Sequence, residues 1–323
     1  MPAALGAELV RELALELRAA ALPMHGAHAG RELADGSRAA SGDVTFAIDE
    51  RAERALETFL AERAPAVAYY SEDRGLVAPE GAQEVLVVDP VDGTRPALAG
   101  LESCCVSIAA APLADGVRMG DVRIGCVVEI PSGAVFLAER GRGLVEAPRV
   151  HLSANTEPNR MFWTFGFRGR PARALTEVLA ELIDASSVGG GTFDLGSAAF
   201  DVTRVLTGQL DAYVEPGPLL VEEVPGMRAE FERVGGGSVL NNSPYDLAAA
   251  VLCAEEAGAI VTDARGRSLR DRPLLGSGAE YQMSIVASAN EALHGRILAA
   301  VAEGLERLRA RPPGARDGDP PLG

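Results

Sequence analysis

The sequence predicts a mixed protein of the α+β or α/β class, with a sheet-rich first half and an α/β second half. Between Ser103 and Leu144, apolar runs of strand length are separated by Gly, Pro and Asp turns, which predicts an antiparallel sheet. Beyond about residue 150, helical segments alternate with short strands, a pattern typical of α/β layering. We therefore expect an N-terminal domain over 1–150, a C-terminal domain over 151–310, and a disordered Pro- and Gly-rich tail over 311–323.

The individual elements follow from local patterns along the chain. Amphipathic helices are predicted over residues 5–22 and Thr45–Arg63, with a loop over residues 23–42 between them. Apolar runs predict strands at Ala66–Tyr70 and Glu84–Val88. In the second half, the predicted helices cover 171–184, 197–206, 246–256 and 290–309, and the predicted strands cover 211–215, 259–262 and 283–287.

The charge balance excludes several classes of function. The 323 residues carry a net charge of −16, which disfavours nucleic acids and anionic membranes as partners because both bind basic surfaces. All 30 basic residues are Arg, so Schiff-base chemistry and the lysines of Walker A loops and kinases are excluded. Four scattered His residues disfavour a His-rich zinc site.

The cysteines and the N-terminal pattern indicate a reducing compartment. The four Cys residues form no CxxC pair, and adjacent Cys104 and Cys105 would face opposite sides of a strand, so we expect buried thiols. The first helix has charges within its apolar pattern, unlike a signal peptide, and no apolar run reaches the ~18 residues of a membrane span. We therefore expect a cytoplasmic protein.

The most informative motif is Asp89-Pro90-Val91-Asp92-Gly93-Thr94, which follows the predicted strand Glu84–Val88. Two carboxylates at i and i+3 can converge if the chain turns, and Pro90 favours a turn. Clustered carboxylates repel one another unless cations lie between them, and oxygen ligands select hard cations such as Mg²⁺. The N–H groups of Gly93 and Thr94 could hold phosphate at a helix start. An ordinary Asp-Gly surface turn is the alternative for this motif taken alone.

Two further acids strengthen the metal interpretation. Glu72 follows the strand Ala66–Tyr70, and Asp246 opens a predicted helix. A solvated loop charge would explain Glu72 alone, and N-capping would explain Asp246 alone. Together with Asp89 and Asp92 they form a spaced set of carboxylates.

Segments in five places, in sequence order, resemble the inositol monophosphatase family of Mg²⁺-dependent, lithium-sensitive sugar and cyclitol phosphatases. The resemblance runs from about residue 40 to residue 265 and implies the layered αβαβα sandwich of the inositol monophosphatase and fructose-1,6-bisphosphatase type. The matching residues are Asp43, Thr45, Asp49 and Glu53, then Glu72, then Asp89–Thr94, then Gly196–Ala199 with Leu210–Glu215, and finally Tyr245–Ala250.

This resemblance implies a site for two to three Mg²⁺ ions, most of whose ligands belong to the N-terminal domain. The implied ligands are Glu72, Asp89 and the Val91 carbonyl for the first ion; Asp89, Asp92 and Asp246 for the second; and Glu72 for a third, weaker ion. Two close ions can activate water and stabilise a leaving alkoxide. Such ions are needed because the chain offers no Lys and no suitable His to neutralise a phosphate.

The resemblance also implies roles outside the metal ligands. Thr94, hydrogen-bonded to Asp49, would orient the attacking water and help to deprotonate it, with Glu72 as a further catalytic residue. The N–H groups of Gly93 and Thr94 would bind phosphate. Glu215 would contact substrate hydroxyls, with Ser197 nearby.

Three departures from the family pattern bear on the substrate. The residues after Thr94 are Arg95-Pro96-Ala97-Leu98, without the usual aromatic, and Arg95 either contacts an anionic substrate or is a solvated helix-start residue. Tyr245 replaces a Trp. The segment 218–243 lengthens the usual spacing between Glu215 and Asp246, as a lid or wall of the leaving-group pocket or as a surface or dimer arm.

These observations predict a Mg²⁺-dependent phosphomonoesterase that acts on a small phosphorylated sugar, cyclitol or polyol. The resemblance implies that it forms a homodimer. A 3′-phosphoadenosine phosphatase or a histidinol-phosphate phosphatase would use the same metal site. The alternative from another class is a catalytically quiet metabolite-binding or scaffolding protein. Lithium inhibition is expected from the family.

Overall fold

The structure, a computed structural model, describes residues 5–38 and 44–310, and for residues 34–38 it describes the backbone alone. Asp43 of the upstream motif and the expected disordered tail over 311–323 lie outside the described residues.

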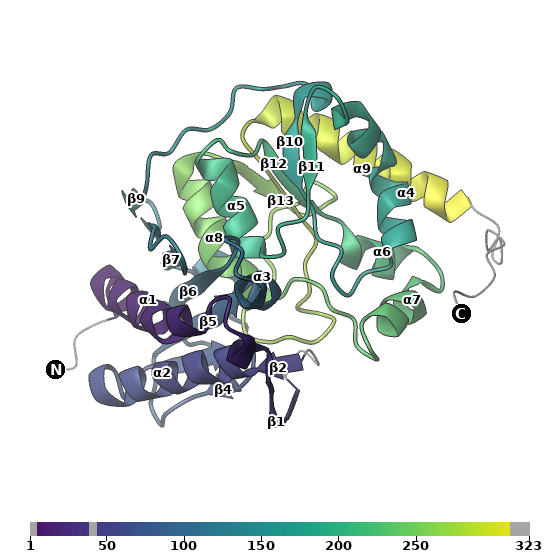
Figure 1. The fold of residues 1–323 in the computed structure, drawn as a ribbon. Coiled ribbons are helices and arrows are strands. Elements are labelled where there is room, and N and C mark those ends of the chain that lie inside the picture. The colour runs from purple at the N-terminus through teal and green to yellow at the C-terminus, as the bar shows by residue number, and fades with distance from the viewer. Residues whose placement is uncertain (1–4, 39–43, 311–323) are drawn as a thin grey trace.

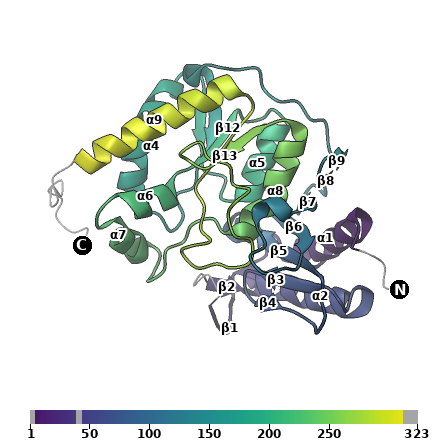
Figure 2. The same cartoon turned by 180° about the vertical axis from the view of Figure 1, so that it is seen from behind.

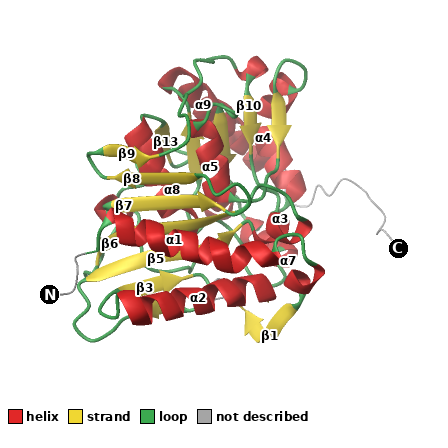
Figure 3. Ribbon diagram, turned by 60° about the vertical axis from the view of Figure 1, so that its left-hand side comes forward, coloured by secondary structure: helices red, strands yellow, loops and turns green. Residues whose placement is uncertain are grey.

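The described chain forms five layers, as the resemblance implies (Figures 1 and 3). Helices α1 (Ala7–Ala21) and α2 (Ala47–Arg63) cover the outer face of a seven-stranded sheet. Helices α5 (Ala198–Leu206) and α8 (Pro244–Ala257) fill the layer between this sheet and a five-stranded one. Helices α4 (Ala172–Ser186) and α9 (Glu291–Ala310) cover the far side of the second sheet.

The first sheet has the strand order β4-β3-β5-β6-β7-β8-β9. Strand β3 runs parallel to β5 and antiparallel to the edge strand β4, and the pairs from β5 to β9 are all antiparallel, as the spacing of the turns predicts. The strand bounds are β3 Ala68–Ser71, β4 Gly75–Val77, β5 Glu84–Asp92, β6 Cys105–Pro112, β7 Ile124–Glu129, β8 Val135–Glu139 and β9 Gly143–Glu146.

Strand β5 is longer than the sequence predicts, because it continues through the Asp-Pro-Val-Asp motif to Asp92. Asp89 pairs with Ser107 and Asp92 pairs with Cys105, so three steps on β5 match two on β6. This extra residue is a β-bulge, which changes the side-chain alternation and lets residues at i and i+3 share a face. The bulge, rather than a turn at Pro90, brings the two carboxylates together.

The second sheet has the order β11-β10-β12-β14-β13, and the sequence predicts its three strands β12, β14 and β13 to within about two residues. Strands β10 and β11 were not expected, since each is only three residues long. The only Trp of the chain, Trp163, lies fully buried in β10 and donates from Nε1 to Ser186 Oγ at 2.9 Å. The bounds are β10 Phe162–Thr164, β11 Gly191–Phe193, β12 Ala212–Glu215, β13 Ile260–Thr262 and β14 Ile285–Ser288.

A further departure from the expectation lies near the N-terminus. The predicted loop over 23–42 contains strand β1 (Leu33–Arg38), which pairs antiparallel with β2 (Val44–Phe46). Short 3₁₀ helices occupy Leu22–Met24, His28–Arg31, Met119–Asp121 and Pro158–Arg160.

The buried surfaces agree with the predicted chemistry of the core. The four cysteines are free and buried, with Cys104 in the cluster under α1 and α2 and Cys105 in the cluster on the other face of the sheet. That cluster continues into residues of both sheets, so the two halves of the chain share a core, and the predicted domain boundary near residue 150 stays a prediction. No helix in the described part of the chain is long and apolar enough to cross a bilayer.

The inserted segment 218–243 is part of the folded body. It contains most of α6 (Gly217–Glu223) and all of α7 (Met227–Val234), which lie beside α4 and α9 (Figure 2). Leu219, Leu220 and Phe231 belong to the core cluster on the α4 and α9 side of the second sheet, and Phe231 is fully buried. An arm that only contacts a partner would not bury these side chains within its own chain.

We predict that Phe231→Ala lowers the free energy of unfolding by about 3–5 kcal/mol, because it leaves a cavity in a packed cluster. Chemical denaturation followed by circular dichroism measures the change. The control is Val234→Ala on the same helix, whose side chain is 39% exposed, and we expect a change of less than about 0.5 kcal/mol. Equal effects of the two variants would contradict an integral role for the segment.

Candidate metal and active site

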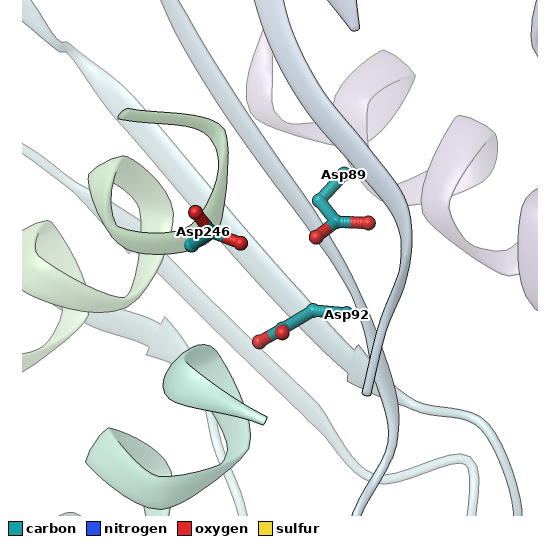
Figure 4. Close-up of side chains that lie close together, drawn as sticks. All are labelled: Asp89, Asp92 and Asp246. Carbon is teal, nitrogen blue, oxygen red and sulfur yellow. The ribbon is translucent and has the colours of Figure 1, made fainter. Parts of the chain in front are cut away.

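Three carboxylates converge between the two sheets. Asp89 and Asp92 come from the bulged end of β5, and Asp246 comes from the first turn of α8. One ligand oxygen from each lies within 4.8 Å of the others, and Figure 4 shows the three side chains pointing toward a shared space. The structure therefore brings together three of the acids that the sequence singled out.

Backbone and hydroxyl donors fix each of these side chains. Asp92 Oδ2 accepts hydrogen bonds from Ser197 Oγ at 2.8 Å and from the Ala199 N–H at 2.6 Å, at the start of α5. Asp89 Oδ1 accepts the Val91 N–H at 3.0 Å, and Asp246 Oδ2 accepts the Ser243 N–H at 2.6 Å within a capping box. Each carboxylate is thus oriented before any ligand arrives.

The electrostatics of the cluster favour a bound cation. Burial, followed by the charges of Glu72, Asp92 and Asp246, raises the pKa of Asp89 well above its ordinary value. Burial also raises the pKa of Asp92 to about 6 and that of Asp246 to about 7. A divalent cation would compete with the bound protons for these oxygens. An all-oxygen donor set fits a hard cation such as Mg²⁺, Ca²⁺ or Mn²⁺.

Glu72 lies on the same cavity but outside this closest group. It follows β3 and lines the cavity together with Asp92 and Asp246. After burial, its charge is the strongest influence on the pKa of Asp89, which places it in electrostatic reach of the cluster. Its predicted role as a ligand of the first and third ions stays a prediction.

The predicted pair of Thr94 and Asp49 is present. Thr94 Oγ1 lies 3.0 Å from Asp49 Oδ1 and 3.1 Å from the Val91 carbonyl, and can donate to either. Asp49 sits in the first turn of α2, where its Oδ2 accepts the Phe46 N–H at 2.8 Å. Burial raises the pKa of Asp49 to about 7. The pair joins the first helical layer to the turn after β5.

Gly93 allows that turn to approach α5. Its φ of 88° is in the left-handed region, and it precedes the short helix α3 (Thr94–Ala99). A Cβ at this position would lie 2.6 Å from the Ser103 carbonyl oxygen and 2.8 Å from Ser197 Cβ. Only glycine fits both requirements, so the N–H groups predicted to bind phosphate sit on a tightly fixed turn.

The predicted substrate contacts are placed differently. Ser197 lines the cavity. Glu215 is fully buried; its Oε2 lies 2.8 Å from Nε of Arg170, which lines the cavity, and its Oε1 accepts the Gly217 N–H at 2.7 Å. Arg95 lies off the wall, where its guanidinium stacks over the Phe46 ring at 5.4 Å. Glu215 and Arg95 thus lie behind or beside the residues that line the cavity, and their substrate roles stay predictions.

Sequence reasoning missed much of the opposite wall. The loop after β10 contributes Arg168 and Arg170, and the end of the inserted segment contributes Val239–Asn242. Tyr213 and Gln282 also line the cavity. The pair of arginines two residues apart was visible in the sequence, but the three-residue strand that places them was not recognised. The end of segment 218–243 forms a wall of the cavity, which is one of the two roles that the sequence predicts for this segment.

Comparisons with known proteins find the family that the sequence motifs resemble. A family model described as the inositol monophosphatase family matches residues 7–306. A protein named putative Nus factor SuhB from Neisseria meningitidis is 27% identical over 228 residues, covering 70% of this chain and 76% of its own. A protein named inositol-1-monophosphatase from Mesorhizobium japonicum is 26% identical over 265 residues, covering 80% of this chain and 83% of its own.

A solved structure shows the same fold. The inositol monophosphatase from Anabaena (Nostoc) superimposes with a TM-score of 0.63 at 20% identity, covering 92% of this chain and 94% of the other.

We predict that the metal-free protein loses stability as the pH rises from about 4 to about 7. Asp49 and Asp246 have pKa values of about 7 when folded, and unfolded Asp titrates near 4. Between these values the folded state binds more protons than the unfolded state, so stability falls with rising pH. The melting temperature in EDTA should therefore be several degrees lower at pH 8 than at pH 5.5.

A saturating divalent cation should raise the melting temperature most at pH 8, because it binds the folded carboxylates without competing protons. Asp246→Asn should raise the melting temperature in EDTA at pH 8 and abolish the gain on adding Mg²⁺. The control is Asp271→Asn, whose side chain is 87% exposed and which should leave both quantities unchanged. A melting temperature in EDTA that does not depend on pH would contradict the assignment.

Proposed function

The chain belongs to the inositol monophosphatase family, and from this premise we propose that it is a Mg²⁺-dependent phosphomonoesterase acting on a small phosphorylated sugar, cyclitol or polyol. The observation that carries the proposal is the convergence of Asp89, Asp92 and Asp246 beside the pair of Thr94 and Asp49. A cluster that only stabilised the fold would not need so many buried and mutually repelling acids.

The residues present fit two or three Mg²⁺ ions. Asp89, Asp92 and Asp246, together with Glu72 and the Val91 carbonyl, would hold them. When bound, such ions supply charge neutralisation of the phosphate, activation of water and stabilisation of the leaving alkoxide.

The chain's own groups would position the reacting water. Thr94 Oγ1 would accept a hydrogen bond from the water while it donates its own proton to Asp49. A carboxylate with a pKa of about 7 is matched to accept a proton near neutral pH. The water oxygen then attacks phosphorus, the P–O ester bond breaks, and the alcohol leaves and acquires a proton.

The phosphate would rest on the turn after β5. The Gly93 and Thr94 N–H groups would donate to its oxygens, because Gly93 holds the turn in a conformation that other residues do not adopt. Ser197 Oγ, held by Asp92 on the adjacent wall, would face the leaving group. A 3′-phosphoadenosine or histidinol-phosphate phosphatase would use the same arrangement with a different pocket.

The alternative of another class is a metabolite-binding or scaffolding protein with little catalysis. It is kept because several relatives are named as Nus factors. An assay of phosphate release decides between an enzyme and a scaffolding protein.

We predict that the purified protein releases phosphate from a broad panel of phosphomonoesters with Mg²⁺ and not with EDTA. Asp92→Asn and Thr94→Val should each lower kcat/KM by at least about 100-fold while the circular dichroism spectrum is unchanged, since even groups outside the ligand set commonly cost 10–100-fold. Asp271→Asn, whose side chain is 87% exposed, is the matched control and should keep full activity. Absence of turnover on the whole panel would favour the scaffolding alternative. Inhibition by lithium is expected in the same assay.

We also propose that the chain acts as a cytoplasmic homodimer through an apolar groove on the face next to the site. The groove has a volume of about 780 Å³, and its walls include Leu101, Phe162 and Phe193, which are 56%, 45% and 40% exposed. Its lining also includes Asp194, which lines the catalytic cavity too. A partner on this face would thus contact the segment that leads to Ser197.

Phe162→Asp should convert a dimer to a monomer at micromolar concentration, because a charge would be buried without a partner. Light scattering coupled to size-exclusion chromatography measures the mass. Val188→Asp, at a position that is 95% exposed, is the control and should leave the mass unchanged. A monomeric wild-type protein would overturn the proposal.

A further inference from the structure

The loop after β10 and the end of segment 218–243 bring two arginines and several amides to the cavity, beside the carboxylate of Asp194. In the family resemblance, Glu215 would contact substrate hydroxyls. Here Glu215 is fully buried against Arg170, which is itself only 8% exposed. The Arg170 guanidinium compensates the charge of the Glu215 carboxylate, so the pair adds no net charge to this wall of the cavity.

Arg170 also fixes the loop on which Arg168 stands. Its Nη1 donates to the Arg168 carbonyl at 2.8 Å, and its Nη2 donates to Asn242 Oδ1 at 3.2 Å. On the other side of the loop, the Phe167 N–H donates to Asp194 Oδ2 at 3.4 Å. The backbone around Arg168 is therefore held from both sides.

The inserted segment packs tightly against this loop. Gly169 has a φ of 69°, and a Cβ added there would lie 2.7 Å from Leu240 Cβ. Beyond Leu240, Asn241 Nδ2 donates to Gln282 Oε1 at 3.2 Å, and Gln282 Nε2 donates to the Val239 carbonyl at 2.7 Å. The wall is thus a network of amides, and the exposed residue Arg168 lies beside it on the same cavity.

Arg168 shares the cavity with two carboxylates of the acidic cluster. It lines the same cavity as Asp92 and Asp246. A guanidinium has only donors, and its hydrogen bonds to anionic oxygens are roughly twice as strong as those between neutral groups. A group bound at Arg168 would therefore be selected for negative charge.

We infer that the alcohol portion of the substrate carries a second anionic group, a carboxylate or a second phosphate, which binds Arg168 at the mouth of the cavity. This inference rests on the proposed function and narrows its substrate class. Arg168, on the loop after β10, would then recognise the alcohol portion of the substrate, a role that the family resemblance gives to Glu215.

Two matched pairs of substrates test the inference. 3-Phosphoglycerate differs from glycerol 1-phosphate by a carboxylate in place of a hydroxymethyl group, and fructose 1,6-bisphosphate differs from fructose 1-phosphate by a second phosphate. With Mg²⁺, the wild-type protein should have a kcat/KM at least about tenfold higher for the anionic member of at least one pair, mainly through KM, as expected for one charge-assisted contact. The pair that shows the preference identifies the anionic group.

Arg168→Gln should lower kcat/KM for the preferred anionic ester by about tenfold and for its neutral partner by less than about threefold. Arg168→Lys, which keeps the charge, should restore most of the preference. Arg233→Gln is the matched control, because Arg233 is 66% exposed on α7 and pairs with Glu230. Equal losses on both members of a pair, or no preference in the wild-type protein, would overturn the inference.

Binding measurements separate this test from that of the proposed function. Isothermal titration calorimetry of the same esters uses the Asp49→Asn variant in Mg²⁺, which should not consume the ligand. Tighter binding of the anionic ester that Arg168→Gln abolishes supports the inference even if no ester is turned over, in which case the proposed function fails. Turnover without any binding preference retains the function and overturns the inference.

Discussion

The mutual repulsion of buried carboxylates is the constraint on which this structure depends. One carboxylate oxygen from each of Asp89, Asp92 and Asp246 lies within 4.8 Å of the others, and burial raises the pKa of each carboxyl group. Such a cluster is costly unless protons or cations compensate it. The surrounding fold supplies the forces that hold it: the bulge in β5, the N–H groups at the start of α5, and the capping box of α8.

The same constraint explains why the site draws on both halves of the chain. Asp92 belongs to the first sheet, but its Oδ2 is held by Ser197 and Ala199, which precede and begin a helix between the sheets. Asp49 comes from the outer helical layer and reaches the turn after β5 through Thr94. No single layer could build the site, so its geometry depends on the packing of at least three.

Much of the fold and the core of the site could be predicted from the sequence. Long amphipathic helices and apolar strands such as Glu84–Val88 have strong periodic patterns, and the acids at their ends were predicted to converge. The bulge after Asp89 could not be predicted, because it depends on the register with Ser107 and Cys105 on the neighbouring strand. Strand β10 is too short to show a pattern, and without it Arg168 and Arg170 had no place in the site. The ion pair between Glu215 and Arg170 was missed for the same reason.

Trp163 gives the molecule a built-in optical reporter. It is the only indole in the sequence, and it lies fully buried in β10 with its ring stacked on Phe165 and its N–H bonded to Ser186. With excitation selective for Trp over the five Tyr residues, the emission of the protein therefore arises from one location, the strand that leads into the Arg168 loop. Changes in the wavelength or quenching of this Trp emission describe the second sheet, while the first sheet carries no indole and has Tyr69 and Tyr70 on β3 as its aromatic reporters.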